Sequence, residues 1–180
     1  DTLVKMGINV VCLGLSTTPT VEIAVPLENA DAGIIITASH NPRNWNALKL
    51  LNNKGEFINA KDGEKLLKIA NSNPHYKYDP KNTGEVEFKN QYIDIHTDLI
   101  INLPLVDADL IRSRNFKVVV DAVNSTGGIA VPNLLNKLGV KVIKLYCDPN
   151  GEFPHNPEPL KENLTDLSKL VIKEQADFGI

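Results

Sequence analysis

Ser39, His40 and Lys49 are the side chains of this sequence whose types and spacing best suit chemistry on an anionic group. Ser39 and His40 follow the apolar run 33–36 after Thr37 and Ala38, and Lys49 lies on the next apolar run. A hydroxyl at the end of a strand can act as a nucleophile, and the backbone N–H groups of a turn favour an anion there. Serine and asparagine also satisfy backbone groups in ordinary turns, so a purely structural turn remains an alternative from the residue types alone.

A serine-hydrolase site is poorly supported by the same residues. The residues around Ser39 read Thr-Ala-Ser-His-Asn, whereas a nucleophile elbow reads G-x-S-x-G. Neighbouring residues of an extended chain point to opposite sides, so we do not expect Ser39 and His40 to form a nucleophile–base pair.

The elements that must position these residues form a predicted α/β unit. Apolar runs predict strands at residues 8–13, 33–37 and 47–51. Helices are expected at residues 21–30 and 62–71, and a surface loop at 71–83. Pro19 suits the first turn of the first of these helices, and Pro26 must end or kink it.

A second α/β unit follows two further predicted helices, at residues 92–101 and 107–113. Residues 117–147 read as strand, glycine turn, helix and strand, which is a βαβ crossover and implies a parallel sheet. A helix at 161–175 leads to the start of one more strand at the last residues. The sequence therefore predicts an α/β fold of two consecutive units with mixed, largely parallel sheets, joined near residues 88–92.

Composition excludes several classes of protein. The chain has 180 residues, is 42% hydrophobic and carries a net charge of −3, which suits one large or two small globular domains. Acidic and basic residues are interspersed without a basic stripe, so no nucleic-acid partner is expected. No apolar run is long enough to span a bilayer, so no membrane partner is expected either. Cys12 and Cys147 are too far apart for a metal knuckle or a disulfide framework, which favours the cytoplasm.

The segment Thr-Ala-Ser-His-Asn-Pro at residues 37–42 resembles the phosphoserine loop of the α-D-phosphohexomutase superfamily. That superfamily includes phosphoglucomutase, phosphomannomutase and phosphoglucosamine mutase. The resemblance covers the whole chain. Residues 14–25 are similar to the Thr-Pro segment ahead of the serine loop, 117–128 to the first strand and turn of the second domain, and 153–167 to its Pro-rich turn and following helix.

The resemblance assigns roles to individual residues. Ser39 matches the serine that holds the transferable phosphoryl group, His40 the histidine beside it, and Lys49 a lysine proposed for general acid/base work. Trp45 stands where the family has tyrosine, and Ala47 where it has glycine. Because alanine is poorly suited to a positive φ, we expect the loop after the serine to be set differently here.

The resemblance also implies a reaction and its cofactors. Phosphate moves between O1 and O6 of a hexose phosphate, through a phosphoserine enzyme and a bisphosphorylated sugar that also serves as activator. Residues 1–88 would be the C-terminal part of domain I of a four-domain enzyme, and residues 89–180 the N-terminal part of domain II. Mg²⁺ would bind the Ser39 phosphate and an Asp-x-Asp-x-Asp-Arg loop expected beyond Ile180, so this fragment alone is expected to be inactive.

Two alternatives accompany the phosphomannomutase/phosphoglucomutase hypothesis. One is a phosphoglucosamine mutase, and the other is a non-catalytic α/β domain that binds a phosphosugar without turnover. The presence of Ser39, His40 and Lys49 together favours an enzyme.

Four further residues are expected to be structural. Asp121 ends a predicted strand and should cap the following turn, not bind metal. His155, flanked by prolines, is assigned to turn structure, and His75 and His96 are expected at the surface without a partner.

Overall fold

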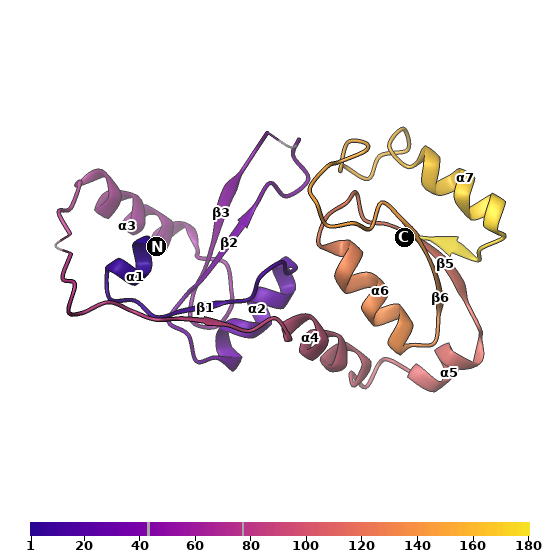
Figure 1. Cartoon of the computed structure of the whole chain (residues 1–180), viewed down its shortest axis with the longest axis horizontal. Helices are drawn as coiled ribbons and strands as arrows, with labels where there is room; N and C mark the ends of the chain where they lie inside the picture. The colour runs from indigo at the N-terminus through magenta and orange to yellow at the C-terminus, as the bar shows by residue number, and fades with distance from the viewer. Residues whose placement is uncertain (43, 77) are drawn as a thin grey trace.

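The computed structural model describes residues 1–42, 44–76 and 78–180, which form two α/β units connected through helix α4 (Figure 1). The elements of the first unit are α1 (Thr2–Lys5), β1 (Val10–Cys12), α2 (Thr18–Leu27), β2 (Gly33–Thr37), β3 (Ala47–Leu51), α3 (Ala60–Asn71) and β4 (Val86–Phe88). β2 and β3 form an antiparallel hairpin, while β1 pairs in parallel with β4. The strands predicted at 33–37 and 47–51 are confirmed at both ends.

Helix α2 covers one face of the β2–β3 hairpin. Its N-cap is Thr17, whose side chain accepts the Thr20 N–H, and Pro26 lies in its last turn, as the sequence predicted. Val25 of this helix packs against Ile35 and Leu51 of the hairpin, and all three are buried. The small core that supports the serine loop therefore consists of one helix on one face of two strands.

The second unit is built around a fully parallel sheet. Its elements, together with the connecting helices, are α4 (Tyr92–Ile101), α5 (Ala108–Ser113), β5 (Lys117–Asp121), α6 (Gly127–Lys137), β6 (Lys141–Leu145), α7 (Thr165–Glu174) and β7 (Phe178–Gly179). The strand order is β6-β5-β7. Val118, Val119 and Val120 of the central strand are at most 1% exposed, because the strand is covered on both faces. The predicted βαβ crossover and final strand are confirmed.

Helix α7 begins later than the sequence predicted. Residues 161–164 form a turn in which the Asn163 N–H donates to the Leu160 carbonyl at 2.9 Å. The Asn163 side chain donates to the Glu158 carbonyl, so local polar bonds replace the first helical turn.

Helix α4 links the two units. It packs against α2 of the first unit and α6 of the second. Lys89 donates to Glu28 at 2.7 Å on the first side, and Lys137 donates to Asp98 at 2.7 Å on the second.

Strand β4, just before α4, was not predicted, because its alternating run Val-Glu-Phe has only three residues, which is shorter than a run that predicts a strand. Residues 72–76 and 78–83 contain no helix or strand, in agreement with the predicted loop, of which residue 77 lies outside the described residues. No helix in the described part of the chain is both long and apolar enough to cross a bilayer.

Candidate active site at the end of strand β2

Ser39 lies in the turn that follows β2, with its side chain exposed and its backbone in the left-handed region at φ 56°. Its N–H donates to Thr37 Oγ1 at 2.9 Å, and its Oγ lies 3.4 Å from His40 Nδ1. A positive φ is uncommon for residues other than glycine, and serine is not among those that adopt it most readily. The turn therefore holds Ser39 in a conformation that its own backbone does not prefer, a feature often found at functional positions.

The contact between Ser39 and His40 contradicts the expectation that these neighbours point to opposite sides. That expectation assumed an extended backbone, whereas the left-handed φ of Ser39 turns the two side chains toward each other. The separation of 3.4 Å is long for a hydrogen bond to a hydroxyl, so the pair is in contact without being tightly bonded.

The rest of the turn is held by local backbone bonds. The Asn41 N–H and its Nδ2 donate to the Ala38 carbonyl at 3.1 and 3.0 Å, and the Trp45 N–H donates to the Pro42 carbonyl at 2.9 Å. Thr37 and Asn41 thus satisfy turn groups, as the structural alternative predicted. The hydroxyl of Ser39 differs from them because, among the described residues, its hydrogen bond is to the His40 ring and not to a backbone group, and the residue is exposed.

Lys49 lies on β3, directly opposite Ile35 of β2. Its side chain is half-buried, and its Nζ lies 5.7 Å from the centre of the Phe57 ring. Ser39 is four residues beyond Ile35, up to about 13 Å along an extended strand. The structure thus brings Ser39 and His40 together and places Lys49 on the neighbouring strand, without a hydrogen bond between Lys49 and either of these two described residues.

Ala47 pairs with Thr37 as the first residue of β3 and is not among the residues with positive φ. The expectation that the loop after the serine is set differently from the family's stays a prediction. The left-handed residue of the described part of this turn is Ser39 itself.

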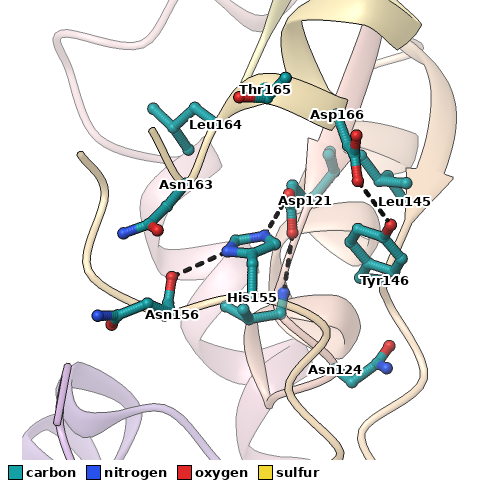
Figure 2. Close-up of polar contacts among 12 residues, drawn as sticks. Asp121, Asn124, Leu145, Tyr146, His155, Asn156, Asn163, Leu164, Thr165 and Asp166 are labelled. Atoms are coloured by element: carbon teal, nitrogen blue, oxygen red, sulfur yellow. Dashed lines mark hydrogen bonds and ion pairs between the residues drawn. The ribbon is translucent and has the colours of Figure 1, made fainter. Parts of the chain in front are cut away.

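A second polar cluster lies at the carboxyl end of β5 (Figure 2). Asp121 Oδ1 accepts the Val123 N–H at 3.1 Å, which confirms its predicted turn-capping role. Its Oδ2 lies 2.9 Å from His155 Nε2, and the two side chains are only 3% and 18% exposed. His155 was expected to serve only turn structure, and its pairing with Asp121 was not predicted because the two residues are 34 positions apart. The sequence feature that could have drawn attention to this pair is Asp121 itself, a carboxylate at the ligand-facing end of a buried strand.

His96 is also paired, contrary to the expectation of a free surface residue. Its Nδ1 lies 2.9 Å from Thr20 Oγ1, and burial at this contact lowers the pKa of His96. His75 is exposed, as expected.

Within residues 1–42, 44–76 and 78–180, no three histidine, cysteine, aspartate or glutamate side chains come together as a metal-binding group.

Comparison with known proteins agrees with the residues of the serine loop. Residues 1–77 match the family domain described as phosphoglucomutase/phosphomannomutase, alpha/beta/alpha domain I, and residues 91–180 match alpha/beta/alpha domain II of the same description. The chain belongs to the phosphoglucomutase/phosphomannomutase family.

Individual members of this family align along almost the whole chain. A phosphoglucomutase/phosphomannomutase of Thermococcus kodakarensis is 35% identical over 99% of this chain, and a probable phosphoglucosamine mutase of Pyrococcus furiosus is 37% identical over 99%. A crystal structure of a phosphoglucomutase/phosphomannomutase family protein from Burkholderia thailandensis superposes with a TM-score of 0.78 at 28% identity, covering 99% of this chain. The chain spans about two fifths of the length of these proteins, 38–39% in each case.

Proposed function

We propose that this chain carries the phosphoserine of a phosphohexomutase, and that Ser39 is the residue that gives and takes back the phosphoryl group. The observation that carries the proposal is the exposed Ser39 hydroxyl, held in a left-handed turn at the end of β2 within a matched family domain. Two features support it further: the His40 ring beside the hydroxyl, and the positive charge of Lys49 on the adjoining strand.

The proposed reaction consists of two phosphoryl transfers. In the first, the bond between Ser39 Oγ and phosphorus breaks, a sugar hydroxyl forms the new bond to phosphorus, and the proton of that hydroxyl is transferred to Ser39 Oγ. In the second, the bond between the other phosphate and its sugar oxygen breaks, Ser39 Oγ forms the new bond to that phosphorus, and the serine proton is transferred to the sugar oxygen. Phosphoryl transfer depends mainly on positioning and charge stabilisation. We assign Lys49 to this proton transfer, in which its amine would have to be neutral to accept the proton and would then return it as an ammonium group. Its place on β3 suits a substrate that lies over the hairpin.

Magnesium is proposed as the metal, with the Ser39 phosphate as one ligand. When bound, it would neutralise charge on the phosphate oxygens. The described residues supply no carboxylate cluster beside Ser39, so the other ligands would come from elsewhere in the full-length gene product. The roles of Ser39, His40 and Lys49 given above do not depend on it.

The proposed substrates are hexose 1- and 6-phosphates, with a bisphosphorylated hexose as activator. The names of the relatives favour two kinds of sugar. One relative is called phosphoglucomutase/phosphomannomutase, and several others are called probable phosphoglucosamine mutases. A hexosamine phosphate is therefore the second candidate.

The test is a mutase assay on the full-length gene product with glucose 1-phosphate, mannose 1-phosphate and glucosamine 1-phosphate, each with its bisphosphate and Mg²⁺. We expect turnover of at least one substrate, and loss of that turnover in Ser39→Ala. Ser72→Ala is the matched control, because Ser72 is an exposed serine that bonds the Ile69 carbonyl at the end of α3. Binding of a phosphosugar without turnover would support the non-catalytic alternative and refute the proposal.

A further inference from the structure

The parallel sheet of the second unit has a topological switch point at its central strand. β6 lies on one side of β5 and β7 on the other, so the two crossovers run in opposite directions. In open α/β sheets, ligands bind in the crevice outside the carboxyl ends of the strands at such a point. Asp121 ends β5 here, and its N–H donates to the carbonyl of Ile180, which follows β7, at 2.8 Å.

The long connection between β6 and α7, residues 146–164, is fastened to this edge of the sheet. It contains no helix or strand, and connections of this length in compact domains are usually either functional or disordered. Asn124 Nδ2 donates to the Glu152 carbonyl at 2.9 Å, and Asn124 Oδ1 accepts the Asp148 N–H at 3.3 Å. In Figure 1 the turn between β2 and β3, which carries Ser39, reaches toward this connection.

Backbone conformation marks the same edge. Val123, Asn124 and Tyr146 all have left-handed backbones, with φ values of 48°, 52° and 50°. This conformation is an outlier for a β-branched residue such as valine. Such residues persist where their surroundings fix them, and they gather at functional sites.

His155 provides the next attachment of the connection, and its two bonds define its charge. Its Nδ1 lies 2.8 Å from the Asn156 carbonyl, which can only accept a hydrogen bond, so Nδ1 donates. Its Nε2 lies 2.9 Å from Oδ2 of the Asp121 carboxylate, so Nε2 donates as well. Both ring nitrogens carry a proton only in the imidazolium form.

The surroundings of His155 favour this charged form. Burial, the largest single influence, disfavours the charge, but the bonds to Asn156 and Asp121 and the charges of Asp121 and Asp166 outweigh it and raise the pKa of His155 above its ordinary value. The Tyr146 ring packs edge-on against the imidazole at 5.9 Å between centroids, and its hydroxyl donates to Asp166 Oδ2 at 3.0 Å. That bond raises the pKa of Tyr146, so the tyrosine remains a neutral donor near neutral pH.

We propose that His155, as an imidazolium bonded to Asp121, is a positioning residue that fixes residues 146–164 over the carboxyl edge of the β6-β5-β7 sheet and thereby orders one wall of the proposed phosphosugar site. The part of this proposal that concerns turnover rests on the proposed function. The part that concerns the connection itself stands on the contacts alone.

The proposal has a definite pH dependence. The pKa of His155 is raised in the folded state. The charged His155 therefore stabilises the folded protein fully below the ordinary histidine pKa, and this stabilisation is lost as the pH rises through the pKa of His155 in the folded state. Loss of the proton removes the donor of one of the two bonds, so residues 146–164 should loosen on the alkaline side.

The experiment compares wild type with His155→Gln and Asp121→Asn, and uses His75→Gln as control because His75 is an exposed histidine away from this edge. Proton NMR follows the imidazole of His155 as a function of pH. Hydrogen exchange, corrected for intrinsic rates, follows residues 146–164 over the same range. The same variants of the full-length gene product are assayed for kcat and KM as functions of pH.

We expect His155 to titrate above the ordinary histidine value in wild type and at least about one pH unit lower in Asp121→Asn. Loss of a charge-assisted hydrogen bond should speed exchange in residues 146–164 by about tenfold or more in His155→Gln, with no remaining pH dependence. In the mutase assay of His155→Gln, kcat should fall while KM changes little. The decline of kcat at alkaline pH that we assign to deprotonation of His155 should be absent from this variant.

The proposal would be overturned if His155→Gln showed the same hydrogen-exchange rates and the same pH profile of activity as wild type. It would also be overturned if Asp121→Asn left the pKa of His155 unchanged. A loosened connection in a protein whose wild type shows no mutase activity would refute the proposed function and still support the positioning role. The two failures are therefore distinguishable.

Discussion

Replacing Lys49 by methionine should separate catalysis from stability at the candidate site. The methionine keeps an unbranched apolar stem next to Ile35 and removes only the ammonium group, whose visible contact is the Phe57 ring at 5.7 Å. A cation–π contact at a partly exposed position contributes about 0.5–1 kcal/mol. We therefore expect the free energy of unfolding to fall by no more than about 1 kcal/mol, which corresponds to a Tm shift of about 2–4 °C.

The expected loss of turnover is much larger. General acid/base assistance is worth a factor of about 10²–10⁴ in rate, or about 3–5 kcal/mol of activation free energy. The assay measures kcat in the full-length gene product beside thermal unfolding of the same sample. The matched control is Phe57→Leu, which removes the ring but keeps the lysine, so it should lose comparable stability and retain most of its turnover. A Lys49→Met enzyme with near-wild-type kcat, or a Phe57→Leu enzyme as slow as Lys49→Met, would refute the assigned role.

Two other predictions concern the first unit. Gly55→Ala should lower the free energy of unfolding by at least about 2 kcal/mol, because a Cβ at φ 77° would lie 1.9 Å from the Glu22 carbonyl oxygen. Gly63→Ala, in an open position of helix α3, should instead stabilise by about 0.5–1 kcal/mol, and chemical denaturation of both variants checks the contrast. The hydrogen bond from Lys89, followed by that from Tyr92, lowers the pKa of Glu28 from its ordinary value of 4.5. The ionised Glu28 therefore stabilises the folded protein above that pH, and this stabilisation is lost as the pH falls through the pKa of Glu28 in the folded state. Glu28→Gln should therefore show a smaller drop in stability than wild type between about pH 6 and about pH 3, and parallel curves would contradict this assignment.

The strands that position the site could be predicted because their signals are local. The run of valines in β5 is buried on both faces, as a central parallel strand requires. The two strands of the hairpin are short apolar runs, and the second is followed by a turn that Gly55 closes with a positive φ. The same apolar runs do not show which side chains are buried, because Ile36 is 70% exposed while its neighbour Ile35 is 7% exposed.

What the sequence could not show depends on conformation or on distant contacts. The meeting of Ser39 and His40 follows from one left-handed residue, and residue type does not determine that conformation in a serine. The bond between Asp121 and His155 joins a strand end to a loop, and only the folded sheet brings them together. β4 alternates apolar and polar residues over only three positions, so its parallel pairing with the distant strand β1 is evident only in the folded structure.

The most direct measurement of the central claim is phosphate transfer from Ser39. The full-length gene product would be labelled with radioactive phosphate, mapped by peptide mass spectrometry, and then mixed with unlabelled hexose 1-phosphate and Mg²⁺. The account predicts that the label lies on the peptide containing Ser39, leaves it on addition of sugar phosphate, and appears in a hexose phosphate product. Label on another residue of an active protein, or label on Ser39 that the sugar never removes, would contradict it.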